Sequence, residues 1–161
     1  MSLWYSAVAG LLGGIISTAL MTIVERHSWR RWGLHGVFEW HENQVIAMRA
    51  FHLSDSRKIH FKGIFFFHFL NGALAGIAFP FIASSFAIVI HYILPLSLFG
   101  LLYGMVLWIL TLAPIHKPIT GFSPWNHPLG HLPALASLGG HILYGIVLGI
   151  VVSFFIGEHA V

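Results

Sequence analysis

The sequence has no cysteine and very little charge. Without cysteine, the chain has no disulfide bond, no thiolate metal ligand and no cysteine nucleophile. Charged residues make up 8% of the 161 residues, whereas a soluble domain has about a quarter. Hydrophobic residues make up 57%, and the mean hydropathy is +0.83. This composition excludes a soluble enzyme, a disordered chain and a nucleic-acid-binding protein, even though the pI is 9.6.

Long apolar runs are what the sequence has instead. A transmembrane helix needs about 20 apolar residues. Four runs meet that length, at residues 3–24, 64–83, 96–115 and 135–156. They predict an all-α fold, an integral-membrane four-helix bundle that forms one domain over residues 1–161. Residues 84–95 are also apolar, and they either prolong the second helix beyond a kink at Pro80 or form a re-entrant link.

The positive charges lie on one side of this predicted topology. All eight Lys and Arg residues fall in the two loops at residues 25–63 and 116–134. The positive-inside rule therefore predicts that both loops are cytoplasmic and that both termini lie outside, in a multi-pass protein of the plasma (inner) membrane. Residues 37–52 lack Gly and Pro and predict a short helix on the membrane interface. The Pro-rich second loop predicts a non-helical cap.

One motif occurs in both the second and the fourth run. Residues 68–77 and 141–150 share the pattern His-x-Leu-x-Gly-x-x-x-Gly-Ile, with weaker echoes at residues 6–15 and 96–105. The repetition predicts two helical hairpins of common design. Glycines at this spacing share one helix face and let helices approach closely. They serve either close packing or a space for a flat cofactor or a lipid tail.

The repeated histidines are the strongest candidates for a site. His68 and His141 each lie one turn before a glycine, Gly72 or Gly145, on the same helix face. The two helices run in the same direction, so the imidazoles are expected at similar depth. Ionisable groups within a span indicate a functional site. The alternative is that each imidazole only joins helices by hydrogen bonds.

Two kinds of ligand suit this pair of histidines. Two imidazoles from two helices hold a haem b iron, and the neighbouring glycines would then admit the porphyrin. Neutral imidazoles also bind Zn, Cu or Fe. A metal ion needs further ligands, and Glu25, His116 and His131 flank the predicted mouth of the bundle.

These motifs also give the chain a resemblance to a known group. It is similar to the YagU-like small four-helix membrane proteins of bacteria and archaea, a family of unknown function. The resemblance covers most of the chain, implies the same fold and brings no activity with it; the long first loop departs from the pattern. The matching residues are Gly13, Gly14, Thr18, Met21 and Thr22; His68, Phe69 and Gly72; Gly104, Trp108 and Pro114; and His141, Tyr144, Gly145 and Gly149.

Three functional hypotheses follow. Small size and the lack of a recognisable nucleophile, phosphate loop or acid–base pair favour an accessory subunit, without catalytic activity of its own. Its partners would be other membrane-protein subunits of a respiratory, photosynthetic or oxygenase-type complex, besides the lipid bilayer. The first alternative is a redox protein that holds haem b or a metal ion through His68 and His141. The second is a small transporter or channel, because a repeated hairpin is compatible with transport.

Overall fold

The computed structural model describes residues 3–53, 57–86, 88 and 92–157, and the regular elements within these ranges are all helical. Three short turns, η1 (Leu34–Gly36), the π-helical η2 (Thr111–His116) and η3 (Pro124–Asn126), lie between the α-helices. The α-helices are α1 (Leu3–Trp32), α2 (Phe38–Ala50), α3 (Phe61–Ser85), α4 (Ile93–Leu110), α5 (Lys117–Thr120) and α6 (Leu132–Gly157).

Four helical stretches are long and apolar enough to cross a membrane, as the sequence predicts. They are Leu3–Trp32, Phe61–Ser85, Ile93–Thr120 and Leu132–Ile156. α1 continues past the predicted end at residue 24, until Gly33 adopts a left-handed conformation with φ of 71°. α3 continues through Pro80 to Ser85, so residues 84 and 85 prolong the second helix. Within the stretch at residues 84–95, residues 87 and 89–91 lie outside the described residues, and residues 93–95 begin α4.

The second loop differs from its prediction. Residues 116–134 were expected to form a non-helical cap, yet α5 and the 3-10 turn η3 lie within this range. Pro118 lies in the first turn of α5, where its missing N–H leaves no helical hydrogen bond unmade. The short helix predicted at residues 37–52 is present as α2, but its side chains from Phe38 to Gln44 are buried in the protein, so its predicted place on the membrane interface is not what the structure shows.

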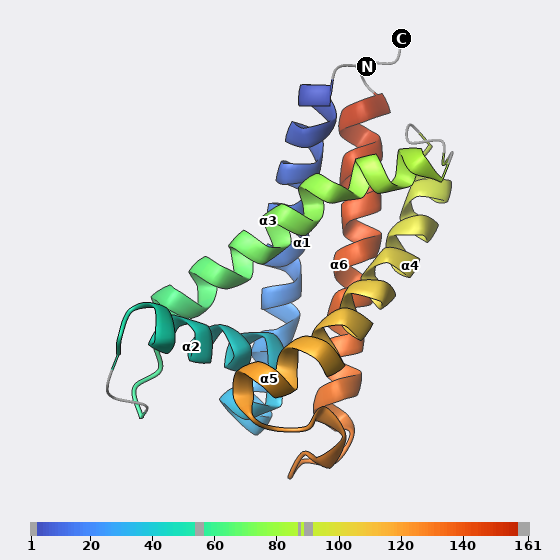
Figure 1. Ribbon diagram of the computed structural model, residues 1–161. Helices are drawn as coiled ribbons and strands as arrows, with labels where there is room; N and C mark the ends of the chain where they lie inside the picture. The colour runs from blue at the N-terminus through green and yellow to red at the C-terminus, as the bar shows by residue number, and fades with distance from the viewer. Residues whose placement is uncertain (1–2, 54–56, 87, 89–91, 158–161) are drawn as a thin grey trace.

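Glycine faces hold the long helices together in pairs (Figure 1). α1 packs against α3, where a methyl group on Gly10 or Gly14 would collide with the backbone of α3. α4 packs against α6, where a methyl group on Gly145 would collide with the backbone of α4. α1 and α6 also pack against each other, which joins the two pairs. The glycines are therefore packing residues.

α3 and α4 meet near one end and diverge toward the other (Figure 1). At the meeting point the Tyr103 hydroxyl donates a hydrogen bond of 2.8 Å to the Ala75 carbonyl, and the rings of Phe79 and Tyr103 lie 5.2 Å apart. α2 lies across the end where the two helices are apart. We call this end, which carries Arg26, Arg30 and α5, the basic end.

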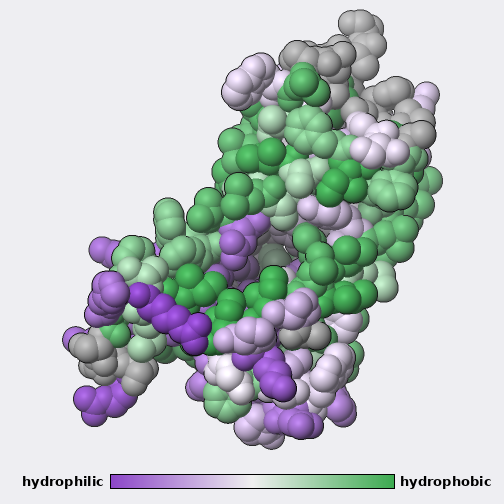
Figure 2. Space-filling model, in the orientation of Figure 1, coloured by the Kyte–Doolittle hydropathy of each residue, from purple (hydrophilic) through white to green (hydrophobic). Residues whose placement is uncertain are grey.

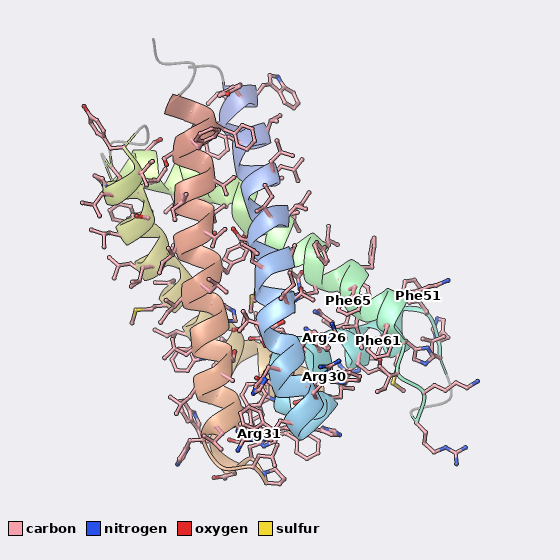
Figure 3. All side chains as sticks on the ribbon, turned by 180° about the vertical axis from the view of Figure 1, so that it is seen from behind. Arg26, Arg30, Arg31, Phe51, Phe61 and Phe65 are labelled. Carbon is pink, nitrogen blue, oxygen red and sulfur yellow. The ribbon has the colours of Figure 1, made fainter. Side chains whose placement is uncertain are left out.

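The outer surface fits a lipid environment. Large apolar side chains on the outside of the spans are exposed, including Ile23 at 67% and Leu102 at 58%. At the basic end, Arg26 and Arg30 of α1 lie toward the side of the molecule that carries Phe61 and Phe65 of α3 (Figure 3). Mixed basic and aromatic side chains are typical of the headgroup region of a bilayer. The direction of the termini and the common design of the hairpins stay predictions.

Candidate functional site

Six ionisable side chains form a buried group at the basic end of the bundle. They come from α1, α2, α3, η2 and α6, and each has an exposed fraction of 8% or less. We call this group the histidine–carboxylate cluster; its members are Glu25, Glu39, Glu42, His68, His116 and His141. The chain has five acidic residues in all, and the cluster contains three of them.

α2 contributes two carboxyl groups because it is a polar helix that lies inside the protein. Its residues Glu39, Glu42 and Asn43 are buried, at 8%, 7% and 2% exposure. Gln44 fixes the helix to the following loop, because its amide donates to the Lys58 carbonyl at 2.8 Å and accepts from the His60 N–H at 2.9 Å. α2 thus closes the basic end with polar side chains directed into the bundle.

Each histidine of the cluster faces one glutamate. His68 Nε2 lies 3.4 Å from Glu25 Oε2, and His141 Nδ1 lies 3.3 Å from Glu39 Oε1. His116 Nδ1 lies 2.8 Å from Glu42 Oε1. Buried charges are costly unless they are paired or bind a metal ion. The three pairs therefore connect five elements of the fold, α1, α2, α3, η2 and α6.

Glu39 is the centre of the cluster. Its carboxyl group interacts with His141, His68 and Glu25, and the Ser137 hydroxyl donates a hydrogen bond to it. Burial raises the pKa of Glu39, but His141 and the Ser137 hydroxyl outweigh it, and the net pKa is lower than usual. Glu39 is therefore an anion at neutral pH, as a metal ligand must be.

Several donor atoms of the cluster have no hydrogen-bond partner. Glu25 Oε1, Glu39 Oε2, His68 Nε2 and His116 Nε2 are buried without one in the described part of the chain. Native proteins leave few buried polar atoms unpaired, and each such atom calls for an explanation. Two facing carboxyl groups, such as those of Glu25 and Glu39, need a shared proton or a cation between them.

The contacts of His141 leave one ring nitrogen available as a ligand. Its Nδ1 lies 2.9 Å from the Ser137 carbonyl oxygen, which accepts hydrogen bonds only, so Nδ1 carries the proton in the neutral ring. Nε2 then has a free lone pair, 3.5 Å from the Thr111 hydroxyl oxygen. That hydroxyl already donates to the Trp108 carbonyl at 3.0 Å. A carbonyl that fixes the tautomer in this way is typical of metal-binding histidines.

Glu42 and His116 form a second, adjoining pair. Burial, and then the charge of Glu39, raise the pKa of Glu42 to about 9, so its carboxyl group holds a proton at neutral pH. His116 is held by the π-helical turn η2, which includes Pro114. Such π-helical segments often occur at functional sites. A metal ion binding nearby would displace the Glu42 proton.

A cavity of about 130 Å³ lies beside the cluster. Glu39, Glu42, His68 and His141 line its polar side, and Ala75 and Leu107 are among the residues on its apolar side. Within the described ranges, no three His, Asp or Glu side chains are arranged to hold a metal ion as they stand. The imidazoles instead contact the carboxyl groups of the cluster.

The structure brings most of the predicted site residues together. Glu25 and His68 are in contact, and Glu39 connects them to His141. His116 joins through Glu42. His131, in contrast, is exposed on the turn before α6.

Of the two predicted glycines, one lies at the cavity and the other does not. Gly72 lines the cavity, and its carbonyl accepts a hydrogen bond of 2.6 Å from the Tyr144 hydroxyl. Gly145 instead packs against the backbone of α4.

The sequence reasoning missed Glu39 and Glu42. Both lie in α2, which was expected on the membrane interface rather than inside the bundle. A signal was present, because acidic residues are rare in this chain and these two are three residues apart on one helix. Residues at that spacing share a helix face.

Comparison with known proteins finds no related protein. No family model matches the chain, and neither a curated protein nor a solved structure matches it significantly. The resemblance to YagU-like proteins therefore stays a prediction.

Proposed function

We propose that this chain is a membrane metalloprotein that binds a divalent first-row metal ion at the histidine–carboxylate cluster. The observation that carries the proposal is the set of buried donor atoms that make no hydrogen bond: one oxygen atom each of Glu25 and Glu39, and the Nε2 atom of His68, whose contact with Glu25 Oε2 is an ion-pair distance of 3.4 Å. A cation among them would supply the partner that these atoms lack.

The proposed ligands are Glu25, Glu39, His68 and His141. Two carboxylates and two imidazoles suit Fe, Mn or Zn by donor type, and the absence of thiolates disfavours Cu(I). Such sets occur in the cores of helix bundles, with ligands from facing helices. Binding requires the carboxylates to leave their imidazole partners and rotate toward the ion. Trp40 supports this set from outside, because its indole N–H donates to Glu25 Oε2 at 2.8 Å.

A metal ion is a better occupant than the haem that the sequence also suggested. Pockets for organic ligands usually measure about 300–1,000 Å³, and the cavity beside the histidines measures about 130 Å³. Of the two glycines that would have to admit a porphyrin, Gly145 packs against the backbone of α4, and the space beside Gly72 is taken by the Thr18 side chain. A porphyrin does not fit between them. The accessory-subunit and transporter hypotheses stay predictions.

The experiment is metal binding by the purified full-length protein in detergent. Mass spectrometry of the metals bound after purification without chelator gives the metal-to-protein ratio. The chelated protein is then titrated with Co²⁺, whose visible absorption reports on the nitrogen and oxygen donors around it. We expect saturable binding that Zn²⁺ or Mn²⁺ displaces.

Variants separate the proposed site from other histidines. Glu39→Gln and His141→Gln are expected to lower Co²⁺ affinity more than about 100-fold. His131→Gln is the matched control, because His131 is exposed and does not line the cavity; the affinity of this variant is expected to equal that of the wild type. Unchanged Co²⁺ spectra and affinity in folded Glu39→Gln protein would overturn the proposal.

A further inference from the structure

An unusual polar residue lies on the outside of α3. Asn71 occupies the middle of an apolar span and is exposed. It contacts Asn43 of α2 through a long hydrogen bond of 3.5 Å from its amide nitrogen to Asn43 Oδ1. A polar group that faces hydrocarbon without a good partner is costly. Asn71 also lines the cavity, so its carboxamide stands at the border between cavity and lipid.

The cavity opens sideways between α3 and α4. These helices meet around Phe79 and Tyr103 and diverge toward the basic end. Figure 2 shows a hollow in this face, with hydrophilic atoms beside a mainly hydrophobic rim. Ala75 and Leu107 line the cavity and are half-buried, whereas Asn43 of α2, on the basic side, is buried. The mouth therefore faces the region that lipid chains occupy around a membrane protein.

The residues that line the cavity determine which kind of head group can bind there. Among the described residues that line the cavity, none is Lys or Arg, and two are glutamates, so an anionic head is disfavoured. Asn43 and Asn71 offer both hydrogen-bond donors and acceptors. A volume of about 130 Å³ is small beside the ~300–1,000 Å³ of usual ligand pockets. Only a small head fits, and a hydrocarbon tail has to remain between the helices or in the bilayer.

We infer that the cavity binds a bilayer-dissolved molecule with a hydrocarbon tail and a small uncharged oxygen head, the class of long-chain alcohols and aldehydes. Asn71 receives the head at the mouth, one helical turn after His68 on α3, and Glu39, Glu42 and His141 of the cluster line the same cavity. The inference rests on the proposed function in placing this head beside metal ligands. It assigns a substrate class and a lateral route that the metal site alone does not require.

The test is photolabelling in liposomes with a diazirine analogue of hexadecanol. We expect labelled peptides to include residues 71–75 and 107–111, and we expect excess hexadecanol to suppress the labelling. Leu107→Trp fills the mouth and should lower the labelling at least about fivefold. Val106→Trp is the matched control, because Val106 is exposed on the same helix and does not line the cavity. Asn71→Leu should also lower the labelling, without adding bulk.

The outcomes separate this inference from the metal proposal. Labelling that is equal in the wild type and in both Leu107→Trp and Asn71→Leu overturns the lateral site, even if metal is bound. Equal competition by palmitate and hexadecanol overturns the uncharged head. Labelling that Leu107→Trp suppresses, in a protein whose metal-to-protein ratio is zero, supports the lateral site and refutes the metal proposal. Metal content should be the same in Leu107→Trp, Val106→Trp and wild-type protein.

Discussion

Two glycines of α6 give a sharp test of how the bundle is held together. Gly145 faces α4, and a methyl group there would collide with the Gly100 carbonyl and approach the Gly104 nitrogen to 3.0 Å. Gly139 lies in the same helix, and a methyl group there would have no atom within 4 Å. The substitutions Gly145→Ala and Gly139→Ala therefore add the same methyl group in opposite surroundings.

The expected magnitudes follow from these contacts. Replacing Gly by Ala in a helix gains about 1 kcal/mol, so Gly139→Ala should stabilise the protein by about that amount. Overpacking costs about 1–3 kcal/mol. The upper end applies at Gly145, because its neighbours are backbone atoms and cannot rotate away. After the helix gain, Gly145→Ala should destabilise the protein by about 2 kcal/mol, which places the two variants about 3 kcal/mol apart.

The assay is equilibrium unfolding in mixed micelles, with denaturing detergent increased stepwise and helix content followed by circular dichroism. The free energy of unfolding of each variant is compared with that of the wild type. Gly145→Ala protein as stable as Gly139→Ala protein would refute the reasoning, because the close approach of α4 and α6 would then not depend on the missing side chain.

Three further predictions concern the site and its supports. Trp40→Phe removes the donor to Glu25 and should weaken Co²⁺ binding about 10- to 100-fold, in a titration where Trp4→Phe, an exposed tryptophan, has no effect. Tyr144→Phe removes the hydrogen bond to the Gly72 carbonyl and should cost about 1 kcal/mol of unfolding free energy, measured as above; a stabilised variant would contradict this. Lower pH should weaken Co²⁺ binding, because protons compete for the ligands; titrations at pH 6, 7 and 8 with equal affinities would contradict the proposed carboxylate and imidazole donors.

The sequence by itself determined the number and position of the long helices. Each span is a continuous apolar run, and in a bilayer the backbone of such a run has to satisfy its hydrogen bonds internally, as a helix does. The Gly-x-x-x-Gly spacing likewise indicated which helix faces approach closely, since spacing on one helix depends on local geometry alone. His68 and His141 were recognisable for the same reason: each is an ionisable residue within an apolar run.

Only the tertiary structure decided which residues join these histidines. The position of α2 depends on contacts between segments far apart in the chain, such as Ser137 with Glu39 and His116 with Glu42. A composition of basic and aromatic residues predicts a helix at the membrane surface and does not reveal that its acidic side points inward. The gap between α3 and α4 also arises from the angle at which whole helices cross. Helix formation depends on neighbours in the chain, whereas the site depends on how separate helices pack, and that is the physical reason for the difference.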